Sequence, residues 1–167
     1  MNTIIAFVIN VLLIALPIAV FEIIIEKDKG WGAGLPKNTW YGKQTTGRFF
    51  EAISRFAKVP NFLGFQVALY FLLLPILIAV EYFLIVEDIN FLIAVFFATL
   101  VTEDFLWFVM NWNFDSLSEL LKGPNGKIWW HKKWVRVWPD NYLPRSYFIA
   151  AILIVVFLFL SEITHGI

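Results

Sequence analysis

The chain has 167 residues, 60% of them hydrophobic, and its 13 basic and 13 acidic side chains give a formal net charge of zero. Soluble domains are about half apolar, so this composition excludes an ordinary water-soluble protein. The balanced charge argues against a nucleic-acid partner. Cysteine is absent, which excludes disulfides, a thiolate nucleophile and cysteine-based metal sites.

Four apolar runs are long enough to cross a membrane as helices. A hydrocarbon core of roughly 30 Å is spanned by about 20 helical residues. The runs cover residues 3–25, 62–86, 89–112 and 146–163. We therefore expect an all-α integral membrane protein in which residues 1–167 form a single membrane domain with two long loops, 26–61 and 113–145.

The basic residues indicate how the chain is oriented. All 13 Lys and Arg lie between residues 27 and 58 or between residues 122 and 145. Short loops rich in Lys and Arg stay on the cytoplasmic side of a membrane. We expect both long loops to be cytoplasmic and both termini to be outside, in the cytoplasmic membrane of a prokaryote.

The first long loop contains an amphipathic segment that should lie on the membrane surface. Residues 48–58 read as a helix with aromatic and aliphatic side chains on one side and charged side chains on the other. Such a helix buries its apolar face at the lipid interface. Arg48, Arg55 and Lys58 are then candidates for contact with lipid headgroups. The preceding glycine-rich residues 30–34 match no phosphate-binding motif, so no nucleotide cofactor is expected.

The third apolar run contains two adjacent acids, Glu103 and Asp104. A carboxylate at membrane depth costs about 2.5 to 3.5 kcal/mol and usually faces other helices or a cavity. Adjacent helical residues point about 100° apart, so the two acids cannot both face one point. Both are candidate catalytic residues, as general acids or bases. The alternative is structural pairing with Arg136, Arg145 or a loop lysine, or hydrogen bonding to Asn111 and tyrosine side chains.

A metal site is a further hypothesis for the same end of the helices. Glu22 approaches the inner face along the first run, and it reaches the depth of Glu103 if Trp107 marks the boundary. His131 is the histidine expected on that side. Glu22, Glu103 and His131 could together bind a divalent metal such as Zn, Mn or Fe, although their spacing matches no known metal motif. Alternatively, His131 is a hydrated interfacial residue.

The second long loop should contain another interfacial helix. Ser116 and Glu119 have the spacing of a capping box, and Gly123-Pro124 ends the segment. The conformation of the following residues, 128–139, stays open. Further candidates for headgroup contact are Lys132, Lys133 and Arg136. Indole rings prefer the headgroup level, which makes an interfacial belt of Trp107, Trp112, Trp129, Trp130, Trp134 and Trp138 the expected arrangement.

Three functions fit this sequence. The first is a small membrane protein with an acidic site that binds a lipid or amphiphile, or performs metal-dependent chemistry, at the cytoplasmic leaflet. The second is a proton- or cation-coupled transporter or channel, because Glu81 adds an acid at another depth, and four helices would then need a homo-oligomer to enclose a path. The third is a non-catalytic scaffold or assembly factor that uses the amphipathic helix to bind lipid or a cytosolic partner.

Overall fold

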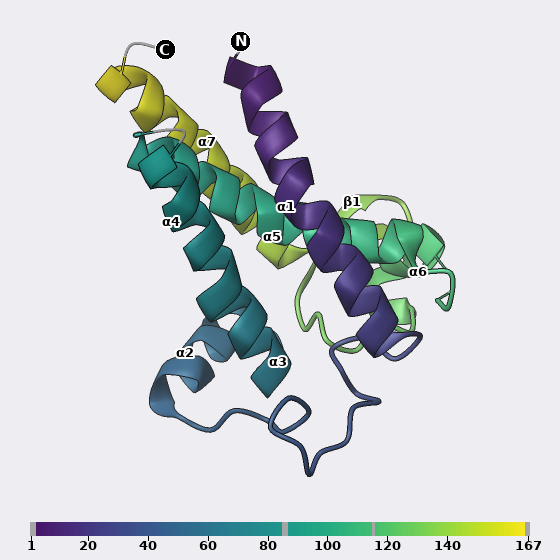
Figure 1. Cartoon of the computed structure of the whole chain (residues 1–167). Coiled ribbons are helices and arrows are strands. Elements are labelled where there is room, and N and C mark those ends of the chain that lie inside the picture. Colours follow the sequence, from purple (N-terminus) through teal and green to yellow (C-terminus); the bar gives the residue numbers. More distant parts are fainter. Residues whose placement is uncertain (1–2, 85–86, 115, 166–167) are drawn as a thin grey trace.

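The computed structural model describes residues 3–84, 87–114 and 116–165. It is mostly helical, and four helices are long and apolar enough to cross a membrane. They are α1 (Thr3–Glu26), the continuous helix formed by α3 (Gly64–Val67), η1 (Ala68–Leu73) and α4 (Leu74–Leu84), α5 (Ile89–Met110), and α7 (Arg145–His165). The start of α1 and the end of α7 lie at one end of the molecule, and the long connections lie at the other (Figure 1).

Shorter elements fill the long connections. The first connection contains α2 (Arg48–Ala57), as predicted, and the second contains α6 (Ser116–Lys122) and the 3-10 turn η2 (Gly123–Asn125). The amphipathic character of α2 leaves Phe49 and Phe56 exposed, at 63% and 74% of their full surface. The side chain of Ser116 is outside the described residues, so the predicted capping box is not tested.

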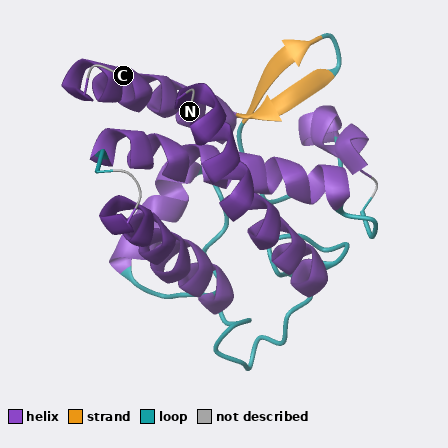
Figure 2. Ribbon diagram, turned by 45° about the horizontal axis from the view of Figure 1, so that its top comes forward, coloured by secondary structure: helices purple, strands orange, loops and turns teal. Residues whose placement is uncertain are grey.

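A two-stranded sheet makes the all-α prediction wrong in one place. Strands β1 (Trp134–Trp138) and β2 (Asn141–Pro144) pair antiparallel, with Trp134 opposite Pro144 (Figure 2). Tryptophan and valine at alternate positions suit a strand. Asp140 adopts a left-handed conformation, with a φ of 63°, at the turn between the strands. The segment whose conformation the sequence left open is therefore partly a hairpin.

Helix α5 is the centre of the bundle. It packs against α1 and α7 far more extensively than against α4. Small residues let membrane helices approach closely, and four alanines of α1 and α5 are buried: Ala15, Ala19, Ala94 and Ala98. Leu92 and Val95, both fully buried, belong to the apolar core at this level. The bundle thus consists of three closely packed helices, with α4 beside them.

Aromatic rings close the bundle at the end where the long connections lie. Trp130, just before the hairpin, stacks on Phe108 of α5, with ring centroids 5.9 Å apart and planes 3° apart. Trp107 meets the ring of Trp130 edge-on, with centroids 5.6 Å apart. Gly30 lies against Trp130 so closely that a Cβ atom there would be 2.4 Å from the indole, and its φ is +51°. The glycine-rich loop is therefore explained by close packing.

The second long helix contains a π-helical segment, η1, directly before Pro75. Proline has no N–H, and its ring clashes with the carbonyl four residues earlier, which here belongs to Phe71. The local change from α- to π-helical bonding appears as a bond from the backbone N–H of Leu74 to the carbonyl of Leu69. π-Helical turns are frequent at functional sites. Tyr70 lies within this segment.

Candidate functional site

Two acids from different helices, α1 and α5, share one tyrosine. The Tyr70 hydroxyl lies 2.7 Å from Oε1 of Glu22 on α1 and 3.0 Å from Oε2 of Glu103 on α5. The two glutamates are only 6% and 2% exposed. The sequence predicted that Glu22 and Glu103 could reach the same depth, and the structure brings them together. It did not predict the tyrosine between them.

The hydrogen-bond count at Tyr70 constrains the protons of this pair. A tyrosine hydroxyl has one hydrogen to donate, and it can also accept a hydrogen bond. Two fully ionised carboxylates would both need that hydrogen. Both contacts are satisfied when one of the two glutamates holds a proton and donates it to the tyrosine oxygen. The geometry therefore favours a Glu22–Tyr70–Glu103 group that holds one proton on a carboxyl.

Asp104 has separate partners. Its Oδ2 atom accepts a hydrogen bond from the Tyr147 hydroxyl of α7 at 2.6 Å and lies 3.2 Å from Nε2 of His131. His131 itself is only 8% exposed. The two adjacent acids of α5 thus point to different neighbours, as the helical geometry requires. Their described contacts are with tyrosine and histidine, not with Arg136 or Arg145.

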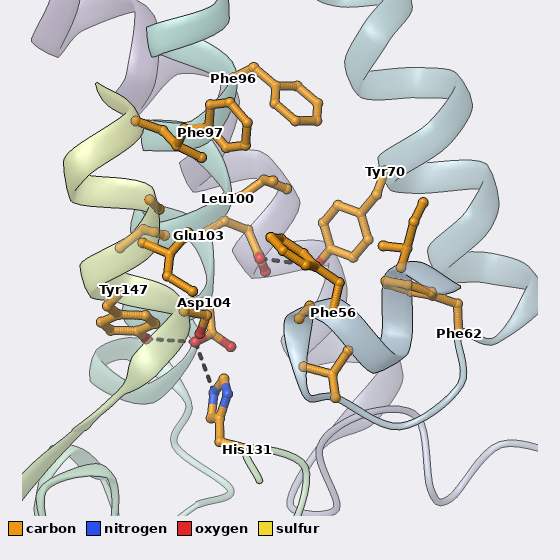
Figure 3. A pocket seen from close by; sticks show the side chains of 18 of the residues that line it. Phe56, Phe62, Tyr70, Phe96, Phe97, Leu100, Glu103, Asp104, His131 and Tyr147 are labelled. Carbon is orange, nitrogen blue, oxygen red and sulfur yellow. Dashed lines mark hydrogen bonds and ion pairs between the residues drawn. The ribbon is translucent and has the colours of Figure 1, made fainter. Parts of the chain in front are cut away.

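Members of both groups border one cavity of about 400 Å³ (Figure 3). Its polar end is formed by Tyr70, Glu103, Asp104, His131 and Tyr147, and the remaining surface is almost entirely apolar. The apolar wall comes from α2, the segment after it, η1, α5 and α7, and includes Ile53, Phe56, Phe62, Phe71, Phe96, Phe97, Leu100, Ile149, Ala150 and Leu153. A long apolar chamber with one polar end results.

The cavity reaches the molecular surface beside α2. Phe56 borders the cavity and is 74% exposed, so its ring marks an opening. α2 is held there by ring contacts: Phe50 of α2 and Phe62 both meet Phe71 edge-on, at 5.2 and 5.3 Å. One main-chain bond also ties the end of α2 to the second connection, from the N–H of Lys132 to the carbonyl of Lys58. These contacts hold α2 and the segment after it in place along the wall of the cavity.

Comparison with known proteins adds no information about this arrangement. No family model, curated protein or solved structure matches this chain. Any functional conclusion therefore depends on the geometry of the site and on the sequence.

The predicted metal ligands are only partly brought together. Glu22 and Glu103 meet through Tyr70, whereas His131 contacts Asp104. Within residues 3–84, 87–114 and 116–165, no three His, Asp or Glu side chains are grouped so that they could hold a metal ion. The metal site formed by Glu22, Glu103 and His131 stays a prediction.

The predicted headgroup cations lie outside the cavity. All six are exposed, namely Arg48, Arg55, Lys58, Lys132, Lys133 and Arg136, and none of them borders the chamber. Among the predicted belt residues, Trp107 and Trp130 are buried at 3% exposure, and Trp134 is half-buried. Trp112, Trp129 and Trp138 are exposed. Contact of these side chains with lipid headgroups stays a prediction.

Sequence reasoning offered tyrosine side chains as partners of the acids, but it did not identify Tyr70 or Tyr147 as those tyrosines. Tyr70 and Tyr147 each lie in an apolar helical run, where a hydroxyl needs a hydrogen-bond partner. Pro75, five residues after Tyr70, was a second available signal, because a proline inside a helix disturbs the preceding turn. Pairing buried tyrosines with buried acids would have identified both contacts, although not which acid each tyrosine meets.

Proposed function

We propose that this chain is an integral membrane protein that binds a single-tailed amphiphile in the chamber between α2, η1, α5 and α7. The observation that carries the proposal is the shape and chemistry of the cavity. About 400 Å³ of apolar space ends at Glu103, Asp104 and His131. Ligand pockets typically combine a mostly apolar wall with a few polar groups that fix orientation.

A second apolar cavity supports the proposal that the amphiphile has a long tail. It has a volume of about 410 Å³, lies between α4 and α5, and shares Phe96 and Phe97 with the first cavity. Along α5, the 15 residues from Ile89 at the far end to Asp104 at the polar end correspond to about 22 Å. One leaflet accounts for about half of a 30 Å hydrocarbon core. A tail that passes the two phenylalanine rings would thus reach beyond one leaflet.

The distribution of charge supports a place for this site within the cell. Every Lys and Arg lies in the two long connections or at the first residue of α7, and the connections lie at the end of the bundle opposite the start of α1 (Figure 1). Glu22 and Glu26 lie in the last turns of α1, which leads into the first connection. By the positive-inside rule, we infer that the polar end of the chamber is at the cytoplasmic leaflet. The opening beside Phe56 would then face that leaflet, so that a lipid could enter sideways.

The test is to fill the chamber. Ala150 of α7 borders the cavity and is 8% exposed, whereas the next residue, Ala151, is exposed and does not border it. In Ala150→Phe the new ring should occupy the apolar space and lower the amount of amphiphile that co-purifies with the protein, as quantified by native mass spectrometry. Ala151→Phe adds the same ring on the outside and should retain it.

The matched pair also separates binding from folding. Both variants should elute as the wild type does in size-exclusion chromatography, because one ring fills an existing cavity and the other points outward. If folded Ala150→Phe carries as much amphiphile as Ala151→Phe does, the chamber is not the binding site and the proposal is wrong.

Proton-coupled transport is the second candidate, and the shared proton of the Glu22–Tyr70–Glu103 group is the observation that favours it. Liposomes that contain the protein would then dissipate a proton gradient, and Glu22→Gln would slow the dissipation. Absence of flux at both polarities of the membrane potential would eliminate this candidate.

A further inference from the structure

The polar end of the chamber is acidic and holds an unsatisfied acceptor. Glu103 is 2% exposed, and its Oε1 atom is buried without a hydrogen-bond partner. Its other oxygen lies 3.0 Å from the Tyr70 hydroxyl. A buried acceptor without a partner costs about 1 to 3 kcal/mol, and more when it is charged. A bound group that donates a hydrogen bond to this oxygen would remove that cost.

The surrounding charges are of one sign. Glu22 and Glu26, at 6% and 5% exposure, lie on α1 one helical turn apart behind Glu103, and the 27%-exposed carboxylate of Asp104 borders the same cavity. His131 is the one basic side chain among the described residues that form the cavity wall, and its Nε2 already faces Asp104. No lysine or arginine is present there to neutralise an anionic ligand.

We infer that the amphiphile bound in this chamber has an ammonium head, which donates a hydrogen bond to Oε1 of Glu103. This inference rests on the proposed function and specifies the ligand class of the same site. Hydrogen bonds between ionised groups are about twice as strong as neutral ones. A phosphate or sulfate head at the same depth would lie beside the carboxyl groups of Glu103 and Asp104, and it would bury its charge with no lysine or arginine in the cavity wall.

The experiment compares heads on one tail. The wild-type protein, freed of lipid in a non-ionic detergent, is titrated with dodecylamine, dodecanol and dodecyl phosphate, and binding is followed by displacement of a fluorescent single-tailed probe. A fourth ligand, a single-tailed phosphoethanolamine lipid, distinguishes a free amine from an ammonium at the end of a lipid headgroup. Dodecylamine should bind at least about tenfold more tightly than dodecyl phosphate.

Two acid variants make the result specific. Glu103→Gln keeps the shape of the side chain but removes its charge, and should weaken dodecylamine by about tenfold while changing dodecanol by no more than about twofold. Glu81→Gln is the matched control, since Glu81 is also an acid of an apolar helix but does not border either cavity. It should leave all four affinities unchanged.

The outcomes distinguish failure of the ammonium inference from failure of the proposed amphiphile binding. If dodecyl phosphate binds as tightly as dodecylamine, or Glu103→Gln weakens the alcohol and the amine equally, the ammonium inference is overturned while amphiphile binding stands. If none of the four ligands displaces the probe, or displacement is the same in Ala150→Phe, then the chamber does not bind amphiphiles and the proposed function itself fails. Tight binding of the phosphoethanolamine lipid alone would identify a membrane lipid as the source of the ammonium.

Discussion

At the residue scale, Tyr70 is the side chain on which the acidic group depends. Its ring is carried by the π-helical segment η1, and its hydroxyl joins α1, through Glu22, to α5, through Glu103. Neither glutamate has a basic partner among the described contacts, so one hydroxyl oxygen organises two buried carboxyl groups. The cost of burying the two acids is offset by this hydrogen-bonding group, not by ion pairs.

Tyr70→Phe should therefore destabilise the protein although it keeps the ring. The variant removes the hydrogen bonds between Tyr70 and the two buried carboxyl groups, and we expect a loss of about 1 to 3 kcal/mol, measured as a lower midpoint of thermal unfolding in detergent. Tyr82→Phe on α4 is the control, because Tyr82 is also a tyrosine of an apolar helix but is not the one that Glu22 and Glu103 share. Equal unfolding midpoints for the two variants would show that the Tyr70 bridge does not stabilise the fold.

At the element scale, α6 is fixed by one carboxylate in its middle, that of Glu119. Glu119 accepts from the ammonium of Lys122 and from the backbone N–H of Lys127 at 3.0 Å. These two contacts, that with Lys122 first, hold the pKa of Glu119 below its ordinary value of 4.5. The carboxylate thus joins α6 to the backbone that follows η2.

This arrangement predicts a pH dependence of α6. A group whose pKa is lower in the folded state stabilises the fold above its unfolded pKa, and that stability is lost as the pH falls through the folded value. Amide hydrogen exchange across residues 117–127 should accelerate, after correction for the intrinsic pH effect, as the pH falls below about 4.5. Glu119→Gln should accelerate the exchange already at neutral pH, because it lowers the local stability of this segment by about 1 kcal/mol. The same substitution at exposed Glu51 on α2 should not, and a persistent pH response in Glu119→Gln would refute the assignment.

The elements also show which parts of the structure a sequence can reveal. The length of the apolar runs was enough to predict the four long helices, and the spacing of apolar residues was enough to predict α2. Each of these signals lies within one segment and does not depend on how the segments pack. The hairpin after Trp130 was not predictable, since its alternating residues also fitted a helix. The cavity, and the contacts of Tyr70 and Tyr147 with particular acids, depend on how helices far apart in sequence pack, which no local pattern encodes.

At the scale of the whole molecule, the long connections are at one end, opposite the start of α1 and the end of α7 (Figure 1). Glu22 and Glu26 lie in the last turns of α1, directly before the first connection. This arrangement is what the basic residues predict if that end is cytoplasmic. It also means that the polar end of the chamber and all 13 cations would share one membrane surface.

The orientation can be tested directly because the chain contains no cysteine. Single cysteines at exposed Asn38 and Asn125, in the long connections, should react with a membrane-impermeant thiol reagent only after the cells are opened. Cysteines at exposed Glu87 and Thr164 should react in intact cells. Labelling of Asn38→Cys or Asn125→Cys in intact cells would reverse the proposed orientation.

The unequal packing of α5 has a consequence for synthesis. Membrane helices insert one after another and associate afterwards, and the main partners of α5 are α1, made long before it, and α7, made last. The helix formed by α3, η1 and α4 is synthesised after α1 and before α5. It is therefore inserted before the main contact of the bundle, that between α1 and α5, can form. Because its later contact with α5 is also the less extensive one, this helix is the part of the bundle that can separate again with the least loss of packing.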